Sequence, residues 1–267
     1  MLGGETRWET PVYLLQSRQA GPTVLVLAGV HGDERAPPVA AWKLLELELT
    51  RGRLYIVPEV NRPALASGTR FSPRARFSDL NRNFPRKPGE PPRGFLAPVL
   101  WRAIQDIRPD WILDLHEGFD FNRRNKKSMG SSIVHVPGTS VSERALSAAR
   151  TVQAAVNATI VSPSRHFTLI APGPAGSVAR SAQEVLGIPS LVFETTRIAQ
   201  PIALRARQQE LMVQAFLRQQ SMLAESQPFN RFHRPRCGYA GSALGIARRY
   251  AGSASARAAA GLVRSIR

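Results

Sequence analysis

The stretch "TVLVLAGVHGDERAP", residues 23–37, joins a continuous apolar run to a turn that carries a histidine, two acids and an arginine. A short run of Val and Leu without polar alternation is typical of a strand covered on both faces. Gly29 and Gly32 allow a tight turn after the run. We therefore expect a buried strand over residues 23–29 that delivers polar side chains at its carboxyl end.

Further apolar runs of the same kind alternate with helical patterns along the chain. The apolar runs cover residues 53–60, 110–116, 131–137 and 189–195. The helical patterns cover residues 36–50, 96–107, 142–156 and 204–220. This alternation predicts an α/β domain with a mostly parallel sheet flanked by helices. Such sheets bind ligands at the carboxyl ends of their strands.

The chain of 267 residues is long enough for one catalytic domain, which we expect over residues 1–227. Two stretches do not fit the alternation. Residues 61–95 are dense in Pro, Gly and Arg, as in loops that are functional or disordered. Residues 228–267 are an Arg, Ala, Gly and Ser mixture, which predicts a basic and largely disordered tail.

The formal net charge of +17 favours a nucleic-acid-binding protein as one alternative. The arginines are scattered through every segment, however, so we expect no nucleic acid partner. A single cysteine, Cys237, excludes an internal disulfide and favours a reducing compartment. The sequence lacks the apolar run of a signal peptide or a membrane span. We expect a soluble, cytoplasmic protein without a membrane partner.

Three apolar runs end in residues that suit a metal site. His31 and Glu34 follow the first run, His116 ends "WILDLH", and Glu194 lies at the end of "LVFET". Two histidines and a glutamate hold catalytic zinc and leave one position open for water. Glu194 is then placed to accept a proton from that water. Each residue also has a structural explanation, such as first-turn helix acids or an ion pair with arginine, but their combination favours a metal centre.

The segments "GVHGDE", "NRPALASGTRF", "SDLNRNFP", "DLHEG" and "VFET" occur in this order. Together they resemble the zinc carboxypeptidase clan, and within it the succinylglutamate desuccinylase and aspartoacylase family, over residues 20–225. The resemblance implies one Zn²⁺ per chain, with His31, Glu34 and His116 as its ligands. It also implies that Glu194 is the general base and acid.

The same resemblance assigns the arginine-rich segment to substrate. It implies that Asn81 and Arg82 hold a substrate carboxylate, and that Arg70 polarises the scissile carbonyl. A guanidinium suits this task because it binds a carboxylate through two parallel hydrogen bonds. Arg74 and Arg76 lie close to Arg70 and remain alternatives for its role.

Several neighbouring polar residues have two interpretations. Asp114 precedes His116 by two residues, so it either orients the imidazole or makes an ordinary buried contact. Glu117 is a second candidate for orienting that ring. Elsewhere, ordinary loop or strand polarity competes with a pocket-lining role for three residues: His135, Arg165 and His166.

We expect zinc-dependent hydrolysis of an amide bond in a small carboxylate-bearing substrate, such as an N-acyl amino acid. The alternative is a carboxypeptidase or amidase that acts on short peptides, including cell-wall peptides. Relatives of the deacylase type carry a further C-terminal domain, and residues 228–267 are too few and too polar to form it. Tyr239 and Tyr250 are the candidates for a C-terminal tyrosine that relatives use. The sequence assigns no oligomeric state.

Overall fold

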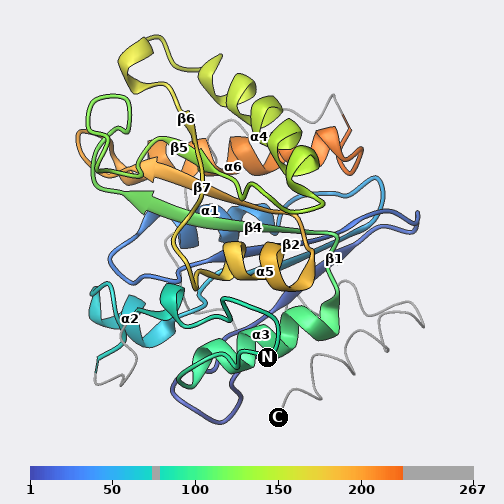
Figure 1. Ribbon diagram of the computed structural model, residues 1–267. Helices are drawn as coiled ribbons and strands as arrows, with labels where there is room; N and C mark the ends of the chain where they lie inside the picture. The colour runs from blue at the N-terminus through green and yellow to red at the C-terminus, as the bar shows by residue number, and fades with distance from the viewer. Residues whose placement is uncertain (74–78, 225–267) are drawn as a thin grey trace.

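A computed structural model describes residues 1–73 and 79–224. In this part of the chain, seven strands form one sheet in the order β1-β3-β2-β4-β7-β5-β6 (Figure 1). The strands are β1 (Tyr13–Gln16), β2 (Thr23–Ala28), β3 (Arg53–Val57), β4 (Trp111–Gly118), β5 (Ser132–Val134), β6 (Thr168–Ile170) and β7 (Ser190–Thr196). The expected α/β class is confirmed.

The sheet is mixed in direction. Strands β3, β2, β4 and β7 are parallel to one another, so their carboxyl ends share one edge, on the left of Figure 1. Strand β1 is antiparallel to β3, and β5 is antiparallel to β7. The four parallel strands carry every strand-end residue of the expected metal site. The parallel direction of these strands is therefore enough to bring the residues to a common edge of the sheet.

Helices cover both faces of the sheet (Figure 1). The helices are α1 (Ala36–Leu44), α2 (Arg62–Ser67), α3 (Leu96–Ile107), α4 (Ser142–Asn157), α5 (Val178–Leu186) and α6 (Ile202–Gln219). Alternate residues of β2 enter two separate cores: Val24 and Val26 pack with α4 and α6, whereas Leu25 and Leu27 pack with α3 and α5. Burial on both faces explains why residues 23–28 are continuously apolar.

The sequence located several elements closely and missed others. Helix α3 coincides with the prediction, and α4 exceeds it by one residue. Helix α1 ends at Leu44 rather than at residue 50, because Leu47 and Leu49 pack on the core outside the helix and Thr50 bonds to Met222. The missed elements are β1, β6, α2 and α5.

Segment 61–95 is not a plain loop, since it contains α2 and a 3-10 turn over Leu80–Arg82. The disordered tail predicted over residues 228–267 lies outside the described residues, as do residues 74–78. None of the described helices combines the length and the apolarity that crossing a bilayer requires.

Gly32 lies where the turn after β2 crosses helix α2. A Cβ atom on Gly32 would lie 1.9 Å from the Ala64 carbonyl oxygen. We expect Gly32→Ala to lower the free energy of unfolding by about 2–3 kcal/mol, because backbone must move to relieve the overlap. Chemical denaturation measures the change. Gly4→Ala is the matched control, since nothing lies within 4 Å of its Cβ, and equal stability of the two variants would contradict the expectation.

Candidate metal centre

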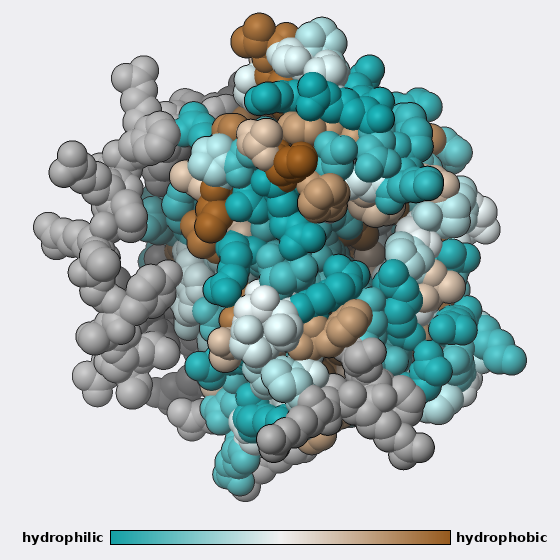
Figure 2. Space-filling model, turned by 90° about the vertical axis from the view of Figure 1, so that its left-hand side faces the viewer, coloured by the Kyte–Doolittle hydropathy of each residue, from teal (hydrophilic) through white to brown (hydrophobic). Residues whose placement is uncertain are grey.

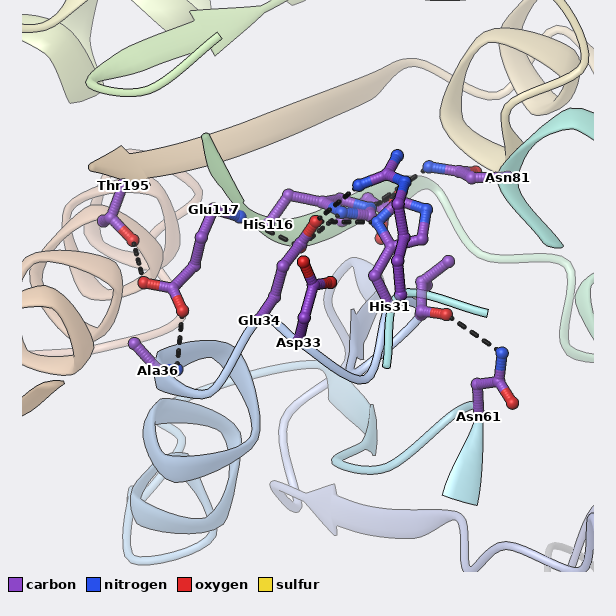
Figure 3. A network of polar contacts seen from close by, with 12 residues as sticks. His31, Asp33, Glu34, Ala36, Asn61, Asn81, His116, Glu117 and Thr195 are labelled. Atoms are coloured by element: carbon purple, nitrogen blue, oxygen red, sulfur yellow. Dashed lines mark hydrogen bonds and ion pairs between the residues drawn. The ribbon is translucent and has the colours of Figure 1, made fainter. Parts of the chain in front are cut away.

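Three buried side chains meet at the carboxyl edge of the sheet (Figure 3). His31 and Glu34 come from the loop after β2, and His116 comes from β4. The Nδ1 atoms of His31 and His116 lie 2.7 Å and 2.9 Å from the two carboxylate oxygens of Glu34. Ligand atoms of all three residues lie within 4.8 Å of one another. The donor set and its convergence fit a divalent metal ion such as zinc.

Glu34 fixes the loop to the neighbouring strand. Its Oε2 atom accepts a hydrogen bond of 3.0 Å from the backbone N–H of Glu117, the residue after His116. Glu34 is only 3% exposed. A buried carboxylate is strongly destabilising unless it is paired and hydrogen-bonded. The loop conformation that brings His31 to His116 is therefore tied to the charge of Glu34.

The outward nitrogen of each imidazole faces a further carboxylate. The Nε2 atom of His31 lies 3.0 Å from Asp79 Oδ1, and Nε2 of His116 lies 3.0 Å from Asp114 Oδ2. The second contact has the distance of an ion pair without hydrogen-bond geometry, and Asp114 is fully buried. A carboxylate that is hydrogen-bonded to the outward nitrogen orients the ring. Asp79 meets this condition at His31, whereas Asp114 places a negative charge beside His116.

These charges shift the titration of the cluster. Burial alone lowers the pKa of His31 and of His116, but the neighbouring carboxylates outweigh burial, so both pKa values lie above the ordinary one. Burial raises the pKa of Glu34, yet the two imidazoles hold it below its usual range. The neighbouring charges thus favour the protonated form of both imidazoles and the ionised form of the Glu34 carboxyl. A cation bound by these residues would compete with those protons.

Glu194 lies beside His116 on the neighbouring strand. The two residues are register partners in the parallel pair of β4 and β7, so their side chains point to the same face. Burial raises the pKa of Glu194 to about 7, and the negative charge of Glu34 adds to this effect, while His116 opposes it. A carboxyl group that titrates near neutral pH is suited to accept and return a proton.

The arginine-rich segment reaches the same centre through Asp79. Arg70 lies 3.3 Å from Glu34 Oε1 and 3.5 Å from Asp79 Oδ2. The Oδ1 atom of Asp79 accepts the backbone N–H of Asn81 at 3.0 Å, and Arg82 lies 3.9 Å from Oδ2. Burial opposes ionisation of Asp79, but His31 and the arginines lower its pKa to about 2.

Sequence reasoning did not single out Asp79, which connects a metal-site histidine to the expected substrate-binding residues. The available signal was its place in "SDLNR", two residues before Asn81. The Asn81 amide group is held as well: its Oδ1 accepts the Val178 N–H at 2.8 Å, and its Nδ2 lies 3.1 Å from His116 Nε2. The residues assigned to metal and to substrate therefore share one hydrogen-bonded network.

Glu117 does not orient the His116 ring. Its carboxylate instead accepts the backbone N–H of Ala36 at the start of α1 (Figure 3). The same carboxylate pairs with Arg205 of α6. Gln209 of α6, also missed from the sequence, donates a hydrogen bond of 2.7 Å to the His116 carbonyl. Helix α6 thus supports strand β4 through contacts with His116 and Glu117.

The other sequence candidates lie away from the cluster. His135 follows β5, which runs antiparallel to β7, so His135 lies at the opposite edge of the sheet. His166 bonds to the Ile160 carbonyl at 2.8 Å, which is an ordinary structural contact. Arg165 lines a cavity beside α6. Four named candidates lie outside the described residues: Arg74, Arg76, Tyr239 and Tyr250.

A mixed α/β sheet with this donor cluster at its carboxyl edge places the chain among carboxypeptidase-like α/β proteins. Residues 20–219 match the succinylglutamate desuccinylase/aspartoacylase catalytic domain. The chain belongs to the succinylglutamate desuccinylase/aspartoacylase family.

Individual relatives are similar to this chain in sequence or fold over only part of their length. An N-alpha-acetyl-L-2,4-diaminobutyric acid deacetylase from Halomonas elongata is 39% identical over 104 residues, which make up 38% of this chain and 30% of that protein. A solved succinylglutamate desuccinylase/aspartoacylase from Rhodobacter sphaeroides is 25% identical, with a TM-score of 0.59 over 80% of this chain and 60% of that one.

Apo Csd4, a cell shape determinant protein from Helicobacter pylori, has a TM-score of 0.65 at 18% identity, covering 85% of this chain and 57% of that one. That likeness concerns the fold. The chain thus spans 30% to 60% of the length of these three relatives.

We expect zinc binding to release about one to two protons per ion at neutral pH, because the raised pKa values keep the imidazoles protonated in the metal-free protein. Titration calorimetry in two buffers of different ionisation enthalpy measures the release. His116→Ala should abolish binding, whereas His166→Ala should leave it unchanged. Zinc affinity that does not fall between pH 8 and pH 6 would contradict the expectation.

Glu194 should destabilise the metal-free protein at neutral and higher pH. Its pKa rises from the ordinary 4.5 to about 7 on folding, so its contribution to stability is lost as pH rises between those values. We expect Glu194→Gln to raise the thermal unfolding midpoint at pH 8 but not at pH 4.5. Exposed Glu5→Gln is the control and should change the midpoint little. If Glu194→Gln raised the unfolding midpoint equally at both pH values, burial of the Glu194 charge would not be the cause of the stabilisation.

Proposed function

We propose that this protein is a zinc-dependent hydrolase that cleaves the amide bond of a small carboxylate-bearing substrate, of the N-acyl amino acid type. The observation that carries the proposal is the buried convergence of His31, Glu34 and His116, with Glu194 in register beside His116. Family membership supports amide hydrolysis. The Halomonas relative, an N-acetyl amino acid deacetylase, supports an acylated amino acid as substrate.

In this mechanism His31, Glu34 and His116 would hold the metal, Asp79 orients the His31 imidazole, and Asp114 supplies negative charge beside His116. Zinc bound there would acidify a water molecule to a pKa of about 7 and polarise the scissile carbonyl. Glu194 accepts the proton of the attacking water and returns it to the leaving nitrogen, since its carboxyl titrates in the same range.

The cationic segment binds and polarises the substrate. Arg82, whose side chain is 40% exposed, is placed to hold a carboxylate together with the Asn81 amide. Arg70 already reaches the cluster, at 3.3 Å from Glu34, and is therefore placed to stabilise negative charge that develops on the carbonyl oxygen. Asp79 holds both arginines near the metal-site histidine.

The zinc-loaded protein should be incubated with a mixed panel of N-acyl amino acids and short peptides, and the products followed by mass spectrometry. We expect chelator-sensitive release of free amino acids from the acylated substrates. Glu194→Gln should bind zinc normally and lose about 10²-fold or more in turnover. Cleavage confined to peptides would make the protein a carboxypeptidase. Turnover close to normal in Glu194→Gln would exclude this residue as the base.

Arg82→Lys should mainly weaken substrate binding. An ammonium group keeps the charge but cannot form the two parallel hydrogen bonds that a guanidinium makes with a carboxylate. We expect KM to rise by about 10-fold, with a smaller effect on kcat. Steady-state kinetics on the preferred substrate measure both constants, and Arg102→Lys on the distant helix α3 is the control. An unchanged KM would exclude Arg82 from carboxylate binding.

A further inference from the structure

A second concave site lies between the end of α4 and the N-terminal half of α6. The cavity has a volume of about 360 Å³, which is large enough for a small organic ligand. Its wall includes Arg165, Gln200, Leu204, Arg207, Gln208 and Leu211. None of these residues belongs to the metal cluster or to the proposed substrate-binding group.

The wall combines positive charge with apolar surface. Arg165 and Arg207 are its charged residues, and within residues 1–73 and 79–224 no acid lines the cavity, although Arg207 also interacts with Glu210 on the same helix. The guanidinium of Arg165 lies over the Phe121 ring at 5.5 Å, which restrains it. Leu204 and Leu211 stand two turns apart on α6, on either side of Arg207, and present an apolar face.

The polar floor of the cavity is tied to the catalytic strand. Gln208 is more than nine-tenths buried and donates to Gln200 Oε1 at 3.4 Å; its own Oε1 has no hydrogen-bond partner among the described residues. Gln200 in turn donates to the Thr196 carbonyl at 2.9 Å, at the end of β7. Hydrogen bonds therefore fix the floor of the cavity between α6 and the end of β7.

We propose that this cavity binds a small carboxylate with an apolar body. The carboxylate pairs with Arg165, and Arg207 adds positive charge to the same wall, because a guanidinium group binds a carboxylate through charge-assisted hydrogen bonds. The apolar body lies on Leu204 and Leu211, which exclude water from the ion pair. A bare anion would make no use of this apolar surface. The proposal is independent of the proposed hydrolysis, since it concerns binding at a separate group of residues.

Hexanoate is the probe, titrated by calorimetry into the full-length protein. We expect Arg165→Met to weaken binding by about 10-fold, which corresponds to the loss of one charge-assisted contact. Leu204→Ser, at a residue that is 39% exposed, tests the apolar wall with little risk to folding and should weaken binding several-fold. Arg102→Met on α3 is the matched arginine control and should bind as the wild type does.

Two further arms locate and identify the site. Arg82→Met should bind hexanoate as the wild type does, because Arg82 lies at the metal centre and not at this cavity. If Arg82→Met lost hexanoate binding while Arg165→Met kept it, the proposal would be overturned. Inorganic phosphate should bind at least about 10-fold more weakly than hexanoate, since it lacks an apolar body. Equal affinity for phosphate, or no hexanoate binding to the wild type, would also overturn it.

Discussion

The buried carboxylate of Glu34 is the interaction on which the site depends. Its two oxygens accept hydrogen bonds from the imidazoles of His31 and His116 and from the backbone N–H of Glu117. Charge removed from water must find such partners, or the fold loses several kcal/mol. The loop after β2 can satisfy Glu34 only by lying against β4. The loop conformation and the convergence of the two imidazoles thus both follow from the burial of one charge.

The surrounding fold meets this requirement from three directions. Parallel pairing aligns the carboxyl ends of β2, β4 and β7. Gly32 lets the loop pass against the Ala64 backbone, where any side chain would overlap it. Behind the sheet, α6 holds β4 through Gln209 and holds Glu117 through Arg205. The positions of the donor atoms are therefore set by rigid elements, as a preorganised centre requires.

Negative and positive groups alternate outward from the centre. Glu34 and the imidazoles form the interior, Asp79 and Asp114 contact the outward nitrogens, and the arginines approach Asp79 from the solvent side. The face that contains this edge of the sheet is largely hydrophilic, with a few apolar side chains gathered on it (Figure 2). Arg70 thus presents positive charge on the solvent side of the cluster, where it would attract an anion. Asp79 contacts both Arg70 and His31, so the positions of these two side chains are coupled.

The sequence by itself determined the buried strand over residues 23–28, the helices over 96–107 and 142–156, and the strand-end places of His31, Glu34 and His116. These features follow from local periodicity and from residue type, which act over a few neighbouring positions. Tertiary structure alone decided the antiparallel direction of β5, the shared role of Asp79 and the raised pKa of Glu194. These depend on pairing and burial between segments far apart in the chain. His135 illustrates the limit: the strand predicted over residues 131–137 included it, but β5 ends at Val134, and only the pairing with β7 reveals that His135 lies toward the far edge.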